Sequence, residues 1–229
     1  MKSYQTLLRI FVFALTFLSL SGCLPPSDGG TADDAPPVLS LPVSDADGRT
    51  VFINTYYGQP GCSVPSEENP YGMHYSLDFK VSLPVAAPGE APVYASCSGT
   101  VTDIIVRETT EQGLLYANVL VRYNRRYTMD YNFEPATRIV VAKGQSVATG
   151  DVLGYLGPCP DDPGHGALDW GLGDNVEKLR KCTVPFLTPA ARARLVGLHG
   201  RVLACAGRHE EADEAFAAAI ALIAEDPGL

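Results

Sequence analysis

The sequence is poor in histidine and in positive charge, and it lacks a long hydrophobic run. Its 229 residues include four His, and 17 Lys and Arg stand against 26 Asp and Glu, which gives a formal net charge of −9. No basic cluster is present, so a nucleic-acid partner is not expected. No two of the six cysteines have C-x-x-C spacing, which disfavours a zinc ribbon. The remaining composition, with 46% hydrophobic residues, 22 Gly and 18 Pro, suits one ordinary core with a small appendage.

The N-terminus has the features of an export signal. Lys2 and Arg9 supply positive charge, and residues 10–20 (IFVFALTFLSL) form an apolar run that is too brief for a transmembrane helix. We therefore expect residues 1–22 to be a signal peptide that is removed. Its loss leaves 15 basic against 26 acidic residues, a formal charge of −11.

The end of this signal, Leu20-Ser21-Gly22-Cys23, resembles the bacterial lipobox. The resemblance implies that Cys23 becomes the mature N-terminus and carries a lipid, which attaches the protein to a membrane of the cell envelope. The alternative is a plain secretory signal followed by a coincidental cysteine. Leu24 stands where an aspartate would favour the inner membrane, so the outer membrane, facing the periplasm, is the expected location.

The chain after Cys23 divides into three parts. Residues 23–42 are rich in Pro, Gly and Asp, which is typical of a tether. Residues 43–185 hold short runs of β-branched and aromatic residues between turn residues, which predict a mainly β domain. Residues 186–229 are rich in Ala, Leu, Arg and Glu at helical spacing, and predict two helices broken at Gly207.

This helical hairpin is similar to a single tetratricopeptide unit. The positions that carry the likeness are Gly200, Gly207, Ala212, Phe216 and Ala219. One such unit cannot bury its own apolar face, because repeat stability comes from stacked neighbours. The hairpin is therefore expected to pack on the β domain or, alternatively, to serve as a docking surface for a partner.

Besides Cys23 the chain has five cysteines, in a compartment where disulfides persist. The odd number leaves at least one thiol free or paired with another molecule. We predict a disulfide among Cys62, Cys97, Cys159 and Cys182, with Cys205 buried as a small apolar side chain. The spacing of the cysteines does not determine which of them pair.

A histidine and an aspartate four residues apart, His74 and Asp78, begin and end the stretch HYSLD. With APVYASCSGTVTDI, VVAKGQSVATGDVLGYLG and a closing ALDWGL, this motif makes residues 72–172 resemble the LytM/lysostaphin-type zinc endopeptidases of peptidoglycan. The resemblance implies an antiparallel β-sandwich built on a duplicated hybrid motif. A hydrolytic zinc needs three protein ligands and an open position for water.

The resemblance assigns the metal ligands to His74, Asp78 and Asp169. Two further family histidines, which orient water and stabilise the oxyanion, correspond to Asn132 and Ala167. An amide cannot take up a proton at neutral pH, and a methyl group does no chemistry. A carboxylate at 169 in place of imidazole weakens the preference for zinc and favours ions such as Mg²⁺, Ca²⁺ or Mn²⁺.

The sequence therefore predicts a lipid-anchored envelope protein with a degenerate LytM-like domain, which binds peptidoglycan or a cell-wall hydrolase without cutting. One alternative is an active metal-dependent peptidoglycan endopeptidase with rearranged ligands, in which a curled loop would recruit His165. A second alternative is an assembly factor that acts through the helical hairpin. The plainest interpretation makes His74 an ordinary strand residue, with Asp78 and Asp169 as turn or capping groups and Glu134 as a solvated turn acid.

Overall fold

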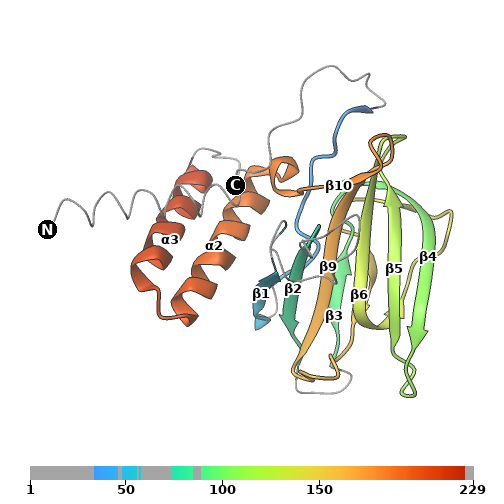
Figure 1. Cartoon of the computed structure of the whole chain (residues 1–229), viewed down its shortest axis with the longest axis horizontal. Helices are drawn as coiled ribbons and strands as arrows, with labels where there is room; N and C mark the ends of the chain where they lie inside the picture. The colour runs from blue at the N-terminus through green and yellow to red at the C-terminus, as the bar shows by residue number, and fades with distance from the viewer. Residues whose placement is uncertain (1–33, 46–47, 56, 58–73, 85–88, 225–229) are drawn as a thin grey trace, which may run out of the picture.

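The computed structural model describes residues 34–45, 48–55, 57, 74–84 and 89–224 (Figure 1). The predicted signal peptide, the lipidation site Cys23 and the residue Cys62 lie outside this part of the chain. Within it the elements are β1 (Val51–Thr55), β2 (Leu77–Ser82), β3 (Ala91–Tyr94), β4 (Gly99–Thr109), β5 (Leu115–Arg122), β6 (Tyr127–Ile139), β7 (Ser146–Val147), β8 (Val152–Leu156), β9 (His165–Asp174), β10 (Leu179–Lys181), the 3₁₀ turn η3 (Val184–Phe186), α2 (Pro189–Cys205) and α3 (His209–Ala224).

The strands form one branched antiparallel sheet. Its main path runs β1-β2-β9-β6-β5-β4-β7, β10 lies beside β9, and β8 joins β6 to β3. Strand β6 shows why the sheet has two unlike faces: Met129, Tyr131 and Phe133 are fully buried on one face, and the residues between them are polar. The predicted antiparallel, mainly β class is confirmed, whereas the division into two sandwiched sheets and the duplicated motif stay predictions.

The core lies against the apolar face of this sheet. Tyr131 and Trp170 are among its largest fully buried side chains, and both bind Ser96, which follows β3. The backbone N–H of Ser96 donates to the Tyr131 hydroxyl at 2.8 Å, and the Trp170 indole N–H donates to Ser96 Oγ at 3.0 Å. Buried polar groups are costly unless they are paired. These hydrogen bonds therefore hold the end of β3 against the inner face of β6 and β9.

The segment before β1 is part of the folded domain. Leu39 is fully buried, Leu41 is nearly so, and the Leu39 N–H donates to the Phe186 carbonyl at 2.7 Å. Farther toward the N-terminus, Arg125 binds the Asp34 carboxylate through Nη2 at 2.7 Å. The predicted tether over residues 23–42 therefore extends too far, because its last apolar residues contribute to the core.

The two C-terminal helices form an antiparallel hairpin, as the sequence predicted. Thr188 caps α2 by accepting a hydrogen bond from the Ala191 N–H at 3.1 Å, and Gly207, with φ of 75°, lies in the turn between the helices. A Cβ built on Gly200 would come within 2.8 Å of the Phe216 ring, so the absence of a side chain lets the helices approach. No helix in the described ranges is both long and apolar enough to cross a membrane.

The hairpin packs on the β domain through α2, which lies beside β1, and α3 lies on the outer side of α2 (Figure 1). Asp45, just before β1, accepts hydrogen bonds from Arg194 and from Arg201 of α2. The arginines hold the pKa of Asp45 below its ordinary value despite its partial burial. Of the two expectations for the hairpin, packing within the chain is thus the one observed for α2.

The structure shows the state of three of the four cysteines considered for a disulfide. Cys97 and Cys159 are free thiols, so the predicted disulfide does not include them. Cys182 is disulfide-bonded. Burial raises the pKa of the Cys97 thiol to about 12, which is consistent with a structural role as a small apolar side chain. The side chain of Cys205 lies outside the described part of the structure.

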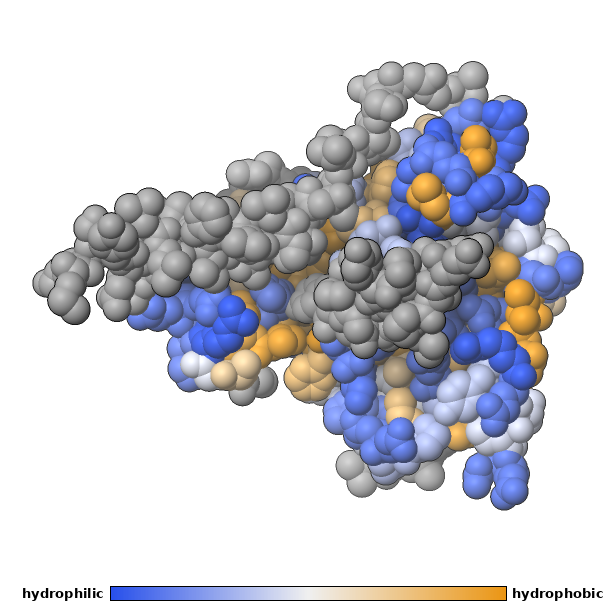
Figure 2. All heavy atoms as spheres, in the orientation of Figure 1, coloured by the Kyte–Doolittle hydropathy of each residue, from blue (hydrophilic) through white to orange (hydrophobic). Residues whose placement is uncertain are grey.

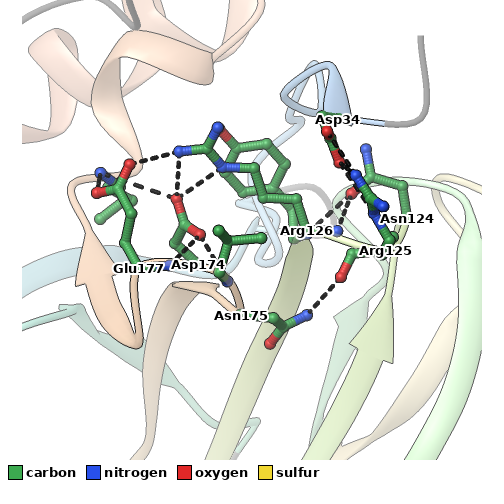
Figure 3. A network of polar contacts seen from close by, with 10 residues as sticks. Asp34, Asn124, Arg125, Arg126, Asp174, Asn175 and Glu177 are labelled. Carbon is green, nitrogen blue, oxygen red and sulfur yellow. Dashed lines mark hydrogen bonds and ion pairs between the residues drawn. The ribbon is translucent and has the colours of Figure 1, made fainter. Parts of the chain in front are cut away.

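A polar network joins the β5–β6 turn to the β9–β10 turn (Figure 3). Asp174, only 2% exposed, accepts a hydrogen bond from Arg126 Nε at 2.9 Å and from the backbone N–H groups of Val176 and Glu177, each at 3.0 Å. Burial opposes ionisation of this carboxyl, but the hydrogen bonds outweigh it and hold the pKa of Asp174 below its ordinary value. The buried charge is therefore well paired.

Candidate functional site

Three of the predicted site residues lie side by side on the polar face of the sheet. In the register of the strands, Asp78 of β2 is opposite Asp169 of β9, and Asp169 is opposite Asn132 of β6. Cross-strand partners point to the same face, with Cβ atoms about 4.5–5.5 Å apart. We call these three residues the polar row. Folding thus brings together three sequence segments that are far apart in the chain.

His74 joins the polar row from the segment before β2. The chain bends at Ser76, and the strand begins only at Leu77, so the bend that a shared site requires is present. His74 Nε2 lies 3.7 Å from Asp169 Oδ2, and Nδ1 lies 3.1 Å from the Ser76 carbonyl oxygen. A carbonyl only accepts, so Nδ1 donates and Nε2 is directed at the polar row.

The two aspartates of the polar row are only partly satisfied. Asp78 Oδ2 accepts a hydrogen bond from Asn54 Nδ2 at 2.7 Å. Within the described chain, Asp78 Oδ1 and Asp169 Oδ1 are buried without a hydrogen-bond partner. Burial raises the pKa of Asp78 to about 6, the Asn54 hydrogen bond opposes the rise, and the charges of Asp169 and Glu134 add to it. A proton or a cation between Asp78 and Asp169 would reduce the repulsion between the two carboxylates.

The set nevertheless does not form a metal centre as it stands. Among the described residues, no group of three or more His, Cys, Asp or Glu is arranged to hold a metal ion. A zinc ion needs its nitrogen and oxygen ligands at about 2.0–2.2 Å, and its histidine ligand is held by a second hydrogen bond such as that of His74 Nδ1. The donor atoms and the tautomer of His74 suit a cation, but the side chains of His74, Asp78 and Asp169 would have to move closer together to coordinate it.

Asn132, which the sequence resemblance aligns with a histidine, is held on two sides. Its side-chain oxygen accepts a hydrogen bond from Arg107 Nη2 of β4, and its Nδ2 donates to Glu134 Oε1 at 2.7 Å. Arg107 Nη2 also lies 3.5 Å from Glu134 Oε1. Glu134 is therefore a strand residue of this network, which corrects the interpretation of it as a solvated turn acid. An amide fixed in this way cannot act as a general base.

A second arginine reaches the same face from β10. Arg180 Nη2 binds Asp130 Oδ2, and Asn118 Nδ2 donates to Asp130 Oδ1 at 2.8 Å. The path of the arginine crosses β9 at Gly171, where a Cβ would lie 2.9 Å from Arg180 Nη1. A glycine at this point leaves the guanidinium room to lie close over β9, and a larger residue would make the Arg180 side chain shift.

Ala167, the other position that the sequence resemblance aligns with a histidine, lies opposite Lys80 on one side and Glu134 on the other. Lys80 Nζ binds Asp162 Oδ2 at 3.2 Å, and His165 Nδ1 lies 2.9 Å from Asp162 Oδ1. His165 is four residues from Asp169 on the same strand, about 13 Å along it, and is engaged elsewhere. The curled loop that would recruit His165 to the ligand set is therefore not what the structure shows.

Sequence reasoning singled out His74 and the polar row but missed the arginines. Arg107 and Arg180 belong to no motif, and a single arginine in a strand predicts nothing about its partner. Gly171 inside β9 was the one available signal, since a glycine within a strand often marks a close approach of another group. The arginines change the character of the site, because they neutralise carboxylates beside the polar row.

Comparison with solved structures finds similar chains of low identity. One is in the crystal structure of the SpoIIIAH and SpoIIQ complex, with 17% identity over 65% of this chain and 99% of that chain, at a TM-score of 0.44. Another is a zinc-containing peptidase from Vibrio cholerae, with 22% identity over 62% of this chain and 39% of that chain, at 0.42. A third is a point mutant of the catalytic domain of the prophage-encoded M23 protein EnpA from Enterococcus faecalis, with 18% identity over 59% and 87%, at 0.39.

Lysostaphin is also among these chains, with 18% identity over 60% of this chain and 48% of that chain, at a TM-score of 0.40. No protein-family model matches the sequence, and no curated protein matches it.

Proposed function

We propose that this protein is a non-catalytic binding protein of the bacterial cell envelope, attached by a lipid on Cys23, and that the polar face around the polar row binds peptidoglycan. The observation that carries the proposal is the state of Asn132. Its amide replaces an ionisable histidine and is held between Arg107 and Glu134. Loss of a positioned acid or base typically costs about 10²–10⁴-fold in rate, and Ala167 removes a second one.

The groups around the polar row suit a ligand that carries amides and charges of both signs. The side chains of Arg107 and Arg180 are 46% and 41% exposed, and that of Glu134 is 38% exposed. Each is held by an intramolecular partner and still presents surface to solvent. Peptide stems of the cell wall offer carboxylates, amines and amides, which such preorganised groups hydrogen-bond without chemical change.

The test is co-sedimentation of the whole purified protein with peptidoglycan sacculi, with release of new amino groups measured in the same tubes. We expect the protein to sediment with the sacculi and to release nothing above a blank. Arg180→Ala, at the edge of the face, should weaken sedimentation, whereas Val176→Ser, on the β9–β10 turn, should not. Release that chelator and His74→Ala both abolish would overturn the proposal.

One observation favours a second candidate, a metal-dependent peptidoglycan endopeptidase with rearranged ligands. The buried Oδ1 atoms of Asp78 and Asp169 lack hydrogen-bond partners in the described chain, and Nε2 of His74 faces the same place. When bound there, a metal would supply a polarising charge and an acidified water. Elemental analysis of protein purified without chelator separates the candidates, because a stoichiometric metal supports the second.

A further inference from the structure

Strand β4 ends the sheet on the side away from the helices (Figure 1). Its inner side pairs with β5 from Thr100 to Thr109. Its outer side pairs with β7 only at Gly99 and Thr100, and Val101 adds backbone hydrogen bonds to the loop before β7. In the part of the chain that the structure describes, no strand adjoins the outer side from residue 103 onward. An unpaired edge is a template for another strand.

Two consecutive aliphatic residues lie on this edge. Ile105 is 45% exposed and Val106 is 49% exposed. Figure 2 shows apolar atoms among polar ones at this end of the molecule. Consecutive strand residues point to opposite faces of a sheet, so a layer packed against one face would cover only one of the two. A strand added in the plane of the sheet would cover both.

The sequence of this edge is complementary to itself. The stretch Asp103-Ile104-Ile105-Val106-Arg107, read against a second copy in the antiparallel direction, places Ile105 opposite Ile105. Asp103 then faces Arg107 at both ends, and Ile104 faces Val106 twice. A two-fold axis through the Ile105 pair is enough to generate all of these pairs. Opposite charges and aliphatic pairs across strands both stabilise pairing.

Neighbouring registers lack this match. A shift of the pairing by one residue puts Asp103 opposite Glu108, which is repulsive at both ends. The register between β4 and β5 also shifts around Thr102 and around Arg107, so one bulge lies just before the stretch and the other at its last residue. Bulges interrupt regular pairing and therefore limit the regular part of a new ladder to residues 103–106, with Arg107 at its end.

The charged groups have capacity for a second partner. Asp103 uses Oδ1 for both of its contacts, with Lys143 Nζ at 3.1 Å and with the Ile104 N–H at 3.1 Å. Arg107 uses Nη2 for both Asn132 and Glu134 in the described chain. A guanidinium has five N–H donors, so Arg107 can hold Asn132 and a partner carboxylate together.

We propose that two copies of this chain associate through β4, antiparallel and in register about Ile105, to continue the sheet from one molecule into the next. The contact shares Arg107 with the polar face and does not otherwise depend on the function proposed for that face. Pairing covers the outer side of β4 in both copies, so no β4 edge remains for a third copy and the assembly stops at a dimer.

Disulfide trapping tests the register directly. Directly opposite residues of antiparallel strands have Cα atoms about 4.5–5.5 Å apart, within the range of about 4.4–6.8 Å that a disulfide spans. The whole protein carrying Ile105→Cys, in mild detergent with a gentle oxidant, should run mainly as a covalent dimer on a non-reducing gel. Wild type and Val176→Cys, a site 61% exposed on the β9–β10 turn, should stay at background. Equal trapping of all three, or none in Ile105→Cys, overturns the proposal.

A charge swap tests the ion pairs in the Ile105→Cys background. Asp103→Lys places two like charges opposite each other at both ends and should reduce the rate of trapping by at least about tenfold. Adding Arg107→Glu restores opposite charges and should recover most of that rate. Circular dichroism checks that each variant is folded, and if the double variant is not, the Asp103→Lys arm decides alone. Unchanged trapping in Asp103→Lys, or a ladder beyond the dimer, contradicts the proposed pairing.

Discussion

Two aspartates in this protein, the buried Asp174 and the half-buried Asp78, lie in opposite electrostatic surroundings. Asp174 on the turn network has Arg126 and two backbone N–H groups around it, and its pKa lies below the ordinary value (Figure 3). Asp78 in the polar row has one amide donor and a neighbouring carboxylate, and burial raises its pKa to about 6. The first arrangement stabilises a charge, whereas in the second burial and the neighbouring carboxylates outweigh the Asn54 hydrogen bond and the contribution of His74.

The difference gives the two residues opposite effects on stability as pH changes. Asp174 binds its proton less tightly in the folded state, so its stabilisation is present above its unfolded pKa and is lost as acid titrates it in the fold. Asp78 binds its proton more tightly in the folded state. Its presence therefore lowers stability as pH rises from 3.8 to about 6, and the full penalty remains above that. Such a penalty is typical of a functional site and not of a structural ion pair.

Removing the paired carboxylate of Asp174 should have the largest effect on stability of the changes considered. Asp174→Ala leaves Arg126 beside unpaired backbone groups and should lower the free energy of unfolding by about 3 kcal/mol. Urea unfolding followed by circular dichroism measures the change. Glu177→Gln in the same network should cost less than about 1 kcal/mol, since Glu177 is 41% exposed. Equal losses of stability in the two variants would show that Asp174 contributes no more than Glu177.

In the polar row, removing a carboxylate is expected to raise the free energy of unfolding instead of lowering it. Asp78→Asn removes a buried charge and offers Asp169 Oδ1 a donor, so it should raise the free energy of unfolding at neutral pH by about 2 kcal/mol. The gain should vanish toward the lower end of the window from 3.8 to about 6, where Asp78 is protonated in the fold. Urea unfolding over that range checks both points. A loss of stability at neutral pH would show that the carboxylate is needed.

A single substitution at Asp169 should make the polar row a better metal site. Asp169→His supplies an imidazole beside His74 and Asp78 and should tighten zinc binding by at least about tenfold, measured by isothermal titration. Ala167→His serves as the matched control, because that position lies between Lys80 and Glu134 and should bring no gain. A similar gain from both variants would mean that zinc binds elsewhere.

The smallest expected effect concerns the arginine at the edge of the row. Arg107→Ala should lower the free energy of unfolding by less than about 1 kcal/mol, because its side chain is 46% exposed. The same change should loosen Asn132, which nuclear magnetic resonance of the side-chain amide would detect as faster hydrogen exchange. A large loss of stability would instead give Arg107 a structural role like that of Asp174.

The sequence predicted the strand-rich domain and the helical hairpin because their signals are local. The short runs of β-branched and aromatic residues between turns and the helical spacing around Gly207 need no distant partner to be recognised. The tether boundary was misplaced because Pro-rich composition hid Leu39 and Leu41, whose burial depends on Phe186 far along the chain. Which of the four candidate cysteines pair could not be read from the sequence, since pairing depends on distances in space; the structure leaves Cys97 and Cys159 as free thiols.

The sequence by itself determined that positions 132 and 167 carry an amide and a methyl group, neither of which can act as a general base. Only the tertiary structure decided what those positions do instead. Arg107 and Arg180 reach Asn132 and Asp130 from strands that are distant in the sequence, one of them over Gly171. Side-chain contacts across a sheet depend on register, and register is fixed by the packing of the whole sheet.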